Sequence, residues 1–169
     1  MKTDAFIGID PGITGAAILL AGGSVEIYDF TDVKGAAHQI NIWRTEFNLK
    51  GAALENPPLR GAGGKGLLSS KFIINLGQWE GILAAYYIDY LLVHPATWQK
   101  KYKHMGSGIW SKKDRSIRLA QKICPQLAHK VCLKRHEHRA DAILMAFYCK
   151  DMFSYSGTQK DLISANGRG

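Results

Sequence analysis

Four residues that can bind cations or move protons lie at the boundaries of apolar runs in the sequence. Asp10 ends one apolar segment and precedes Pro-Gly, Glu55 ends a second, and His138 and Asp141 come just before a third. Carboxylate and imidazole donors of this kind suit Mg²⁺ or Mn²⁺. Two such ions about 4 Å apart can activate a water molecule and stabilise a leaving oxygen. These residues therefore predict metal-dependent hydrolysis of phosphodiester bonds.

Each carboxylate also has an ordinary structural explanation. Aspartate is favoured in turns, so Asp10 could bind nearby backbone amides, and Glu55 could face solvent at the rim of a sheet. Asp141 could interact with the dipole at the start of a helix. Convergence favours the functional interpretation, because two carboxylates at the ends of neighbouring strands would meet, and together they attract a cation.

The last pair raises a choice between neighbouring side chains. On a helix, residues three apart share a face, so His138 and Asp141 can point the same way. Glu137 lies on the same turn and is the rival of His138 for a place near the other acidic groups. From the residues alone, both alternatives stay open.

The elements that must position these residues follow from the apolar runs and the turn residues between them. Strands with tight turns at 5–9, 14–20 and 25–30 predict an antiparallel meander. Two more strands, both buried, are predicted at 51–54 and 90–94, and a glycine- and proline-rich loop covers 56–70. Helices are predicted at 34–47, at 70–85 with Ser70 as its cap, at 95–102, from 111 or 112 to 124, and at 139–153.

The length of 169 residues fits one compact domain. The order of the elements predicts an α/β domain, in which a mixed sheet of about five strands, the first three antiparallel, is flanked by helices. We place this domain at 1–153 and expect 154–169, which is polar and contains glycine, to be a flexible tail.

The charge of the chain is strongly positive. Lysine and arginine total 22 against 14 aspartates and glutamates, which gives a net charge of +8. An excess of this size in a small domain favours an anionic partner such as nucleic acid. Basic groups neutralise phosphates without reading bases, although any one of them could be a solvated surface charge. The candidates for DNA binding lie in predicted loops and at helix starts: Arg60, Lys65, Lys71, Lys100, Lys101, Lys103, Lys112, Lys113 and Arg115.

The cysteines and the N-terminus point to a reducing compartment. Cys124, Cys132 and Cys149 are odd in number and have no repeated spacing, which argues against a disulfide framework. With the nearby histidines they match no tight zinc pattern, and Cys149 is expected in the core. The N-terminus does not resemble a signal peptide, and no apolar run approaches the roughly 20 residues of a membrane span. We therefore expect a cytoplasmic protein of a bacterial host, one that could associate with the nucleoid.

Segments along most of the chain, from about Ala5 to Cys149, resemble the motifs of the RuvC resolvases, which have the RNase H-like fold. Four of them occur in order and at sensible spacing. The first motif is matched by Ile-Gly-Ile-Asp-Pro-Gly-Ile-Thr-Gly at 7–15, and the second acidic strand by Ala-Leu-Glu at 53–55 with the loop after it. The elements that follow are matched by 76–81, 93–100 and the Lys112-Lys113 helix. The last motif, in which members carry Asp or His three residues before an Asp, is matched by His-Arg-Ala-Asp-Ala at 138–142.

The resemblance implies that Asp10, Glu55 and Asp141 are ligands of Mg²⁺, with two ions per site and Mn²⁺ able to substitute. It implies that His138 is a further ligand or a base that orients the attacking water. It also implies a homodimer whose two sites cut two strands of a four-way (Holliday) or otherwise branched DNA junction, with no small-molecule cofactor and no membrane. The short spacing from Asp10 to Glu55 is more like phage or prophage members than the bacterial housekeeping protein.

One departure from the family concerns the loop after Glu55. Residues 57–65 carry no aromatic side chain at the place where some members stack on a junction base, so the preference for one sequence or one junction is open. Two other functions remain alternatives. A catalytically silent DNA-binding or scaffold module would bind without cutting. An actin-like nucleotide-binding protein would need two such domains and a second glycine-rich phosphate motif, for which the chain is too short.

Overall fold

The computed structural model describes residues 1–57, 69–105 and 112–166 of the chain. Its centre is a five-stranded sheet with the strand order β3-β2-β1-β4-β5. Strands β1, β2 and β3 pair antiparallel, whereas β4 pairs parallel with β1 and with β5. The predicted mixed sheet with an antiparallel start is therefore confirmed. The strands are β1 (Asp4–Asp10), β2 (Ala16–Ala21), β3 (Ser24–Asp29), β4 (Asn48–Glu55) and β5 (Tyr90–Val93).

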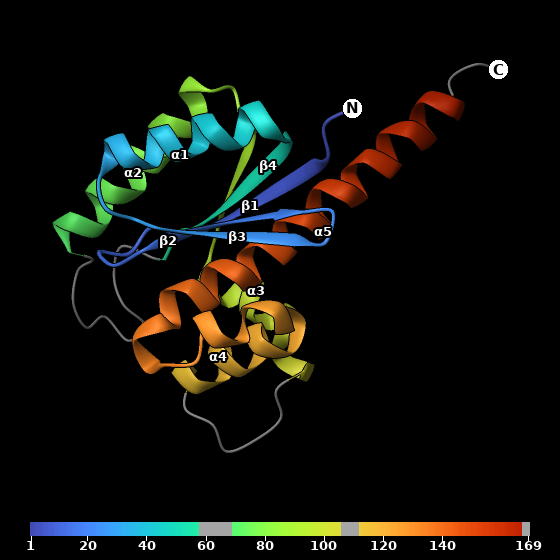
Figure 1. The fold of residues 1–169 in the computed structure, drawn as a ribbon. Helices are drawn as coiled ribbons and strands as arrows, with labels where there is room; N and C mark the ends of the chain where they lie inside the picture. The colour runs from blue at the N-terminus through green and yellow to red at the C-terminus, as the bar shows by residue number, and fades with distance from the viewer. Residues whose placement is uncertain (58–68, 106–111, 167–169) are drawn as a thin grey trace.

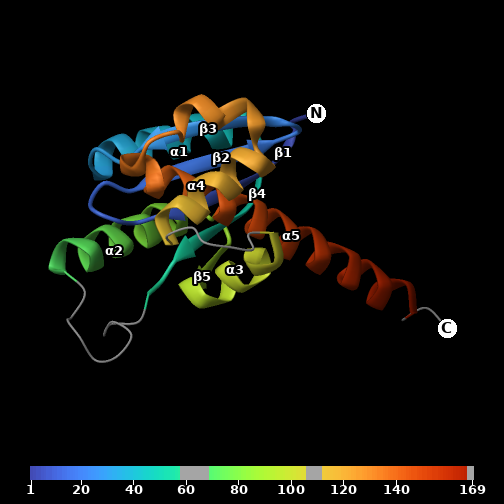
Figure 2. The ribbon, with the colours of Figure 1, turned by 90° about the horizontal axis from the view of Figure 1, so that it is seen from below.

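Helices cover both faces of the sheet. In Figure 1, α1 and α2 lie on one face, and α3, α4 and α5 lie on the other. The view from below in Figure 2 shows α5 passing under the sheet and projecting beyond it. The helices are α1 (Val33–Glu46), α2 (Ser70–Ala85), α3 (Pro95–Tyr102), α4 (Lys112–Ile123) and α5 (Glu137–Asn166), with three short 3-10 turns, η1 (Lys103–Met105), η2 (Pro125–Lys130) and η3 (Lys134–His136).

The central strand β1 is buried on both faces because its side chains alternate between two cores. Ile7 and Ile9 belong to the core under α1 and α2, which also contains the indoles of Trp43 and Trp79. Phe6 points to the opposite core, which α3, α4 and α5 close. A strand buried on both sides reads as a continuous apolar run, which is why β1 was recognisable in the sequence.

Strand β1 and helix α5 touch at Gly8. A Cβ at this position would lie 2.1 Å from the backbone nitrogen of Ala146 and 2.2 Å from the backbone oxygen of Ala142. Only glycine allows two backbones to approach this closely. The contact brings the end of β1, with Asp10, next to the start of α5, with Asp141.

Side-chain caps fix the starts of three helices. Asp32 accepts a hydrogen bond from the backbone N–H of Gly35 at the start of α1, and His94 accepts one from Ala96 at the start of α3. The cap of α2 is Ser69, whose hydroxyl accepts from the N–H of Phe72. We had predicted Ser70 for this role. The two serines are adjacent and equally able to cap a helix, so the residue types alone do not distinguish them.

Two predicted elements differ from the structure. Strand β5 is an edge strand rather than a buried one, because it pairs only with β4 and leaves Leu92 45% exposed. Helix α5 begins at Glu137, not Arg139, and continues to Asn166 instead of ending at Phe153. No proline interrupts the polar segment after Phe153, and polarity alone does not stop a helix. Among the described residues, no helix is both long enough and apolar enough to span a bilayer.

Candidate active site

Asp10 is the last residue of β1 and is held by the turn that follows it. The backbone N–H of Gly12 donates to Asp10 Oδ1 at 2.8 Å. The backbone N–H of Gly15 donates to the carbonyl oxygen of Gly12, and this hydrogen bond closes the turn. Burial raises the pKa of Asp10 to about 6, although the Gly12 bond lowers it, and the charge of Glu137 raises it further. The carboxyl group therefore lies in a position where its negative charge is poorly solvated.

Glu55 ends the neighbouring strand, β4. Because Ile9 pairs with Leu54 in the parallel ladder, the residues that follow them, Asp10 and Glu55, lie at the same edge of the sheet. The indole Nε1 of Trp98, a buried residue of α3, donates to Glu55 Oε1 at 3.1 Å. Helix α3 therefore orients the second carboxylate.

Asp141 lies near the start of α5, facing the same edge of the sheet. Its Oδ1 is buried and has no hydrogen-bond partner among the described residues. Burial raises the pKa of Asp141 well above its usual value, a hydrogen bond with Ser116 lowers it, and the charges of Glu55 and Asp10 raise it further. The charges of Asp10 and Glu55 therefore act on Asp141, which places the three carboxylates within one electrostatic neighbourhood.

These three carboxylates fit a divalent cation by their chemistry. Buried acidic groups that repel one another are stabilised by a cation between them, and the orphaned oxygen of Asp141 lacks the partner that a buried acceptor needs. In the described part of the chain, no three His, Cys, Asp or Glu side chains already lie close enough together to enclose a metal ion. The inference that a divalent cation can bind here therefore rests on the chemistry of the three carboxylates and on their burial.

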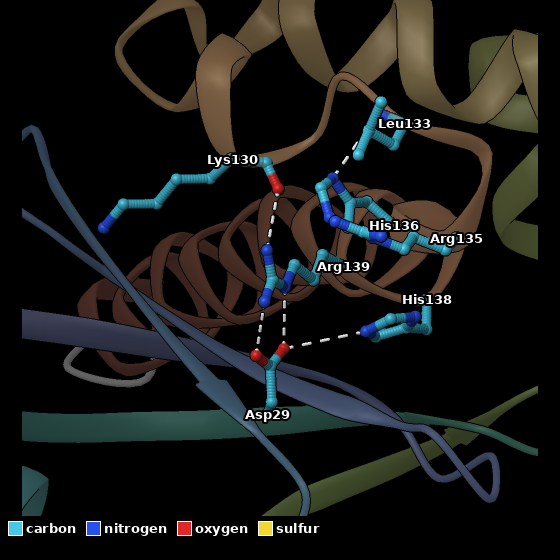
Figure 3. A network of polar contacts seen from close by, with 7 residues as sticks. All are labelled: Asp29, Lys130, Leu133, Arg135, His136, His138 and Arg139. Atoms are coloured by element: carbon cyan, nitrogen blue, oxygen red, sulfur yellow. Dashed lines mark hydrogen bonds and ion pairs between the residues drawn. The ribbon is translucent and has the colours of Figure 1, made fainter.

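The two rivals at the start of α5 have different surroundings. The Nε2 atom of His138 lies 3.6 Å from Oδ1 of Asp29, at the end of β3, as Figure 3 shows. Burial lowers the pKa of His138, and the nearby Asp29 raises it. Glu137, in contrast, raises the pKa of both Asp10 and Asp141 through its charge. His138 thus contacts β3, and Glu137 interacts with the carboxylates.

Asp29 belongs to a polar network that joins β3 to α5 (Figure 3). Arg139 donates to both of its carboxylate oxygens, through Nε at 2.7 Å and Nη2 at 2.5 Å. The third donor, Arg139 Nη1, binds the backbone oxygen of Lys130 at 3.0 Å. The Arg139 hydrogen bond lowers the pKa of Asp29, so this carboxylate stays ionised at neutral pH. Asp29 was not recognised from the sequence, because it reads as an ordinary residue at a strand end.

A groove of about 840 Å³ connects these groups on the surface. Asp10, Glu137 and Asp141 line it together with the Asp29 network. Its other lining residues come from the turn after β1 and from η3, which contributes Lys134, Arg135 and His136. Of the four predicted site residues, Asp10, His138 and Asp141 line the groove. Glu55 is placed near them by the sheet and by its effect on the pKa of Asp141.

The predicted DNA-binding residues lie in several places. Arg60 and Lys65 fall outside the described residues, as do the side chains of Lys112 and Lys113 in α4. Lys71, Lys100 and Lys103 are exposed, and Lys101 forms an ion pair with Asp151. Arg115 is partly buried; with Lys100 and Lys103 it lines a smaller hollow beside α3. Lys134, Arg135 and Arg139, which line the groove with the carboxylates, were not among those predicted.

The architecture and the position of the carboxylates define an RNase H-like fold. No protein-family model matches the sequence, and no curated protein matches it significantly. Among solved structures, T. thermophilus RuvC in complex with a Holliday junction substrate has a TM-score of 0.55 and 16% identity, over 84% of this chain and 90% of that one. A second Thermus thermophilus RuvC structure has a TM-score of 0.53 and 18% identity, over 91% and 97%. The chain therefore has a RuvC-like fold.

Proposed function

We propose that this chain is a metal-dependent endodeoxyribonuclease that hydrolyses phosphodiester bonds in four-way or otherwise branched DNA. The observation that carries the proposal is that Asp10, Glu55 and Asp141 come from three separate elements and lie close enough for the charges of Asp10 and Glu55 to raise the pKa of Asp141. Buried carboxylates with raised pKa values cost stability, and such groups cluster at functional sites. The RuvC-like fold supports this assignment, and the net charge of +8 is consistent with a DNA substrate.

Asp10, Glu55 and Asp141 would hold Mg²⁺ or Mn²⁺, and we propose two ions per site. When bound, such ions supply charge stabilisation at the phosphate and a nucleophilic water at neutral pH. The protein positions the carboxylates for this role through the Gly12 N–H on Asp10, the Trp98 indole on Glu55 and a hydrogen bond of Ser116 with Asp141.

We propose His138 as the fourth residue of the site. It lines the same groove as Asp10 and Asp141, and its lowered pKa keeps the imidazole neutral at pH 7. A neutral imidazole can ligate a cation or accept a proton from water, whereas a protonated one can do neither. Its contact with Asp29 at 3.6 Å is longer than a good hydrogen bond. Glu137 remains the rival, because its charge acts on both Asp10 and Asp141.

The preference for branched DNA and the assembly are also part of the proposal. The RuvC whose fold resembles this chain was solved with a Holliday junction. We propose that this chain binds branched DNA in the same manner, as a homodimer with two sites, and that it is a phage or prophage-like relative.

The experiment that tests the function is cleavage of labelled DNA. Four-way, three-way, flap and linear substrates are incubated with the protein, with and without Mg²⁺. We expect cleavage of branched substrates only with the metal. Asp10→Asn, Glu55→Gln and Asp141→Asn should each nearly abolish cleavage and leave DNA binding intact.

The matched control is Glu46→Gln, the same acid-to-amide change at an exposed position at the end of α1, which should cleave like the wild type. Full activity in one of the three site variants would remove that residue from the site. Binding of branched DNA by the wild type without any metal-dependent cutting would instead support a silent DNA-binding or scaffold module.

A further inference from the structure

The groove beside the carboxylates has a basic rim that the proposed chemistry does not use. The residues that line the groove include the acidic Asp10, Asp29, Glu137 and Asp141 and, from the η3 turn, the basic Lys134 and Arg135, which we call the basic rim. Both basic residues are exposed. Within the described residues, no carboxylate forms an ion pair with either of them. Two uncompensated cations therefore lie at the mouth of an acidic groove.

The third cation of the groove is not available in the same way. The guanidinium of Arg139 donates to both carboxylate oxygens of Asp29 and to the backbone oxygen of Lys130. Its charge is compensated by Asp29 and its donors are committed, so Arg139 has a structural role. Lys134 and Arg135 remain as the groups that can bind an incoming anion.

The η3 turn holds the two cations in place. The N–H of His136 donates to the carbonyl of Leu133 at 2.8 Å, and the N–H of Leu133 approaches His136 Nδ1 at 3.4 Å. Arg135 Nε lies 3.5 Å from His136 Nε2. A neutral imidazole accepts at only one nitrogen and a protonated one at neither. A neutral His136 therefore accepts from Leu133 or from Arg135 but not from both at once, and the guanidinium of Arg135 has further N–H donors besides Nε with which it can bind an anion.

We propose that Lys134 and Arg135 form a phosphate-binding rim, which holds the backbone of the nucleic-acid strand beside the bond that the carboxylate site cuts. This inference rests on the proposed nuclease function. A groove of about 840 Å³ is large enough for a nucleotide-sized group. The carboxylates alone would repel a phosphate, and the two cations that line the same groove would offset part of that repulsion. Arginine can also bind a phosphate through two parallel hydrogen bonds.

The test compares the affinities of variants for DNA. A labelled four-way junction and a linear duplex are titrated in EDTA, with fluorescence anisotropy as the readout, at several salt concentrations. The rim variant is Lys134→Ala/Arg135→Ala. The matched control is Lys130→Ala/Lys150→Ala, which removes the same two charges from exposed positions that do not line the groove. The swap Lys134→Arg/Arg135→Lys keeps both charges on the rim.

We expect the rim variant to bind on the order of 10- to 100-fold more weakly at about 0.1 M salt, with a salt slope less steep by about two. The control and the swap should retain the affinity and slope of the wild type. A loss shared equally by the rim variant and the control would overturn the proposal, since it would reflect total charge only. Unchanged binding of the rim variant would overturn it as well.

Parallel cleavage in Mg²⁺ separates this proposal from the proposed function. If the wild type cuts branched DNA but the rim variant binds like the control, the rim proposal fails and the nuclease stands. If the wild type cuts no substrate, the nuclease function fails. A loss of affinity confined to the rim variant would then still support a nucleic-acid site at Lys134 and Arg135.

Discussion

Asp10 illustrates how a residue proposed for function can work against stability. Its pKa of about 6 in the folded protein lies above the usual value of 3.8, so the folded state binds this proton more tightly than the unfolded chain. The contribution of Asp10 is therefore most favourable in acid and is lost as the pH rises from about 4 to about 6. Above that range, the buried charge destabilises the metal-free protein by about 2–3 kcal/mol.

Replacing this charge should therefore stabilise the metal-free protein. We expect Asp10→Asn in EDTA at pH 7 to unfold with a free energy about 1–3 kcal/mol higher than the wild type, with the gap closing toward pH 4. The amide oxygen can still accept the Gly12 N–H. Urea unfolding followed by circular dichroism, at pH 7 and at pH 4, measures the difference in the free energy of unfolding between the two proteins. Equal stability of both proteins at pH 7 would show that Asp10 is better solvated than its burial indicates.

The choice between His138 and Glu137 can be made by substitution. We expect His138→Ala to lose most cleavage activity, and Glu137→Ala to lose less. Because burial lowers the pKa of His138, wild-type cleavage should fall as the pH drops below the usual histidine value of about 6.5. The part of this acid limb that comes from the imidazole should vanish in His138→Ala, whereas the part that comes from the raised pKa of Asp10 should stay. His138→Asp should keep part of the activity, since Asp also ligates Mg²⁺.

Single-turnover rates across pH measure both effects. If Glu137→Ala is inactive and His138→Ala is active, the acidic neighbour is the fourth residue of the site, and the contact of His138 with Asp29 is its native role. The nuclease assignment would survive that outcome, because it depends on the three carboxylates.

At the scale of elements, the site depends on how closely β1 packs on α5. The two backbones touch at Gly8, two residues before Asp10 and opposite Ala142, which follows Asp141. A side chain at this contact would push the strand and the helix apart. The distance between the first and the third carboxylate is therefore set by a residue that carries no chemistry.

Gly8→Ala should be among the most damaging small substitutions in the chain. Its methyl group would meet backbone atoms at 2.1 and 2.2 Å, and backbone cannot rotate away. We expect a loss of about 3 kcal/mol or more, or failure to fold. Gly81→Ala in α2 is the control, because a Cβ there meets nothing within 4 Å. It should stabilise the protein by up to about 1 kcal/mol. Thermal melts compare the two, and a tolerated Gly8→Ala would contradict the close contact.

Local patterns predicted most elements of the fold. The apolar runs of β1 and β4, the Pro-Gly turn after Asp10 and the proline at the start of α3 each act within a few residues. The predictions were wrong where contacts between distant parts of the chain determine the exposure of a strand or the start of a helix. The exposure of Leu92 depends on which strand lies at the edge, and the start of α5 depends on η3, which leads into it.

The same distinction applies to the candidate site. Asp10, Glu55 and Asp141 stand out in the sequence as candidates because each is an acidic residue at the boundary of an apolar run, and their role in the site stays a prediction. Asp29 could not, since its partner Arg139 lies 110 residues away in the chain. Lys134 and Arg135 looked like any other basic residues, and only the groove distinguishes them.

At the scale of the whole molecule, a basic protein surrounds an acidic site. The net charge of +8 favours an anionic partner such as DNA, and the buried carboxylates would repel the phosphates of DNA locally unless a cation were bound. We therefore expect DNA binding and DNA cleavage to depend on different groups. Binding to DNA should depend on surface lysines and arginines, and cleavage should depend on the metal.

Binding of DNA by the wild type should therefore weaken steeply with salt, even in EDTA. Each phosphate neutralised by Lys or Arg releases counterions, so the logarithm of affinity falls with that of salt by about 0.9 per contact on duplex DNA. If 4 to 6 of the excess cations contact phosphates, a rise from about 50 to about 200 mM salt should cost on the order of 10²- to 10³-fold in affinity. Anisotropy titrations of a four-way junction at four salt concentrations measure the slope. A flat dependence would mean that the positive surface does not bind DNA, whatever the carboxylates do.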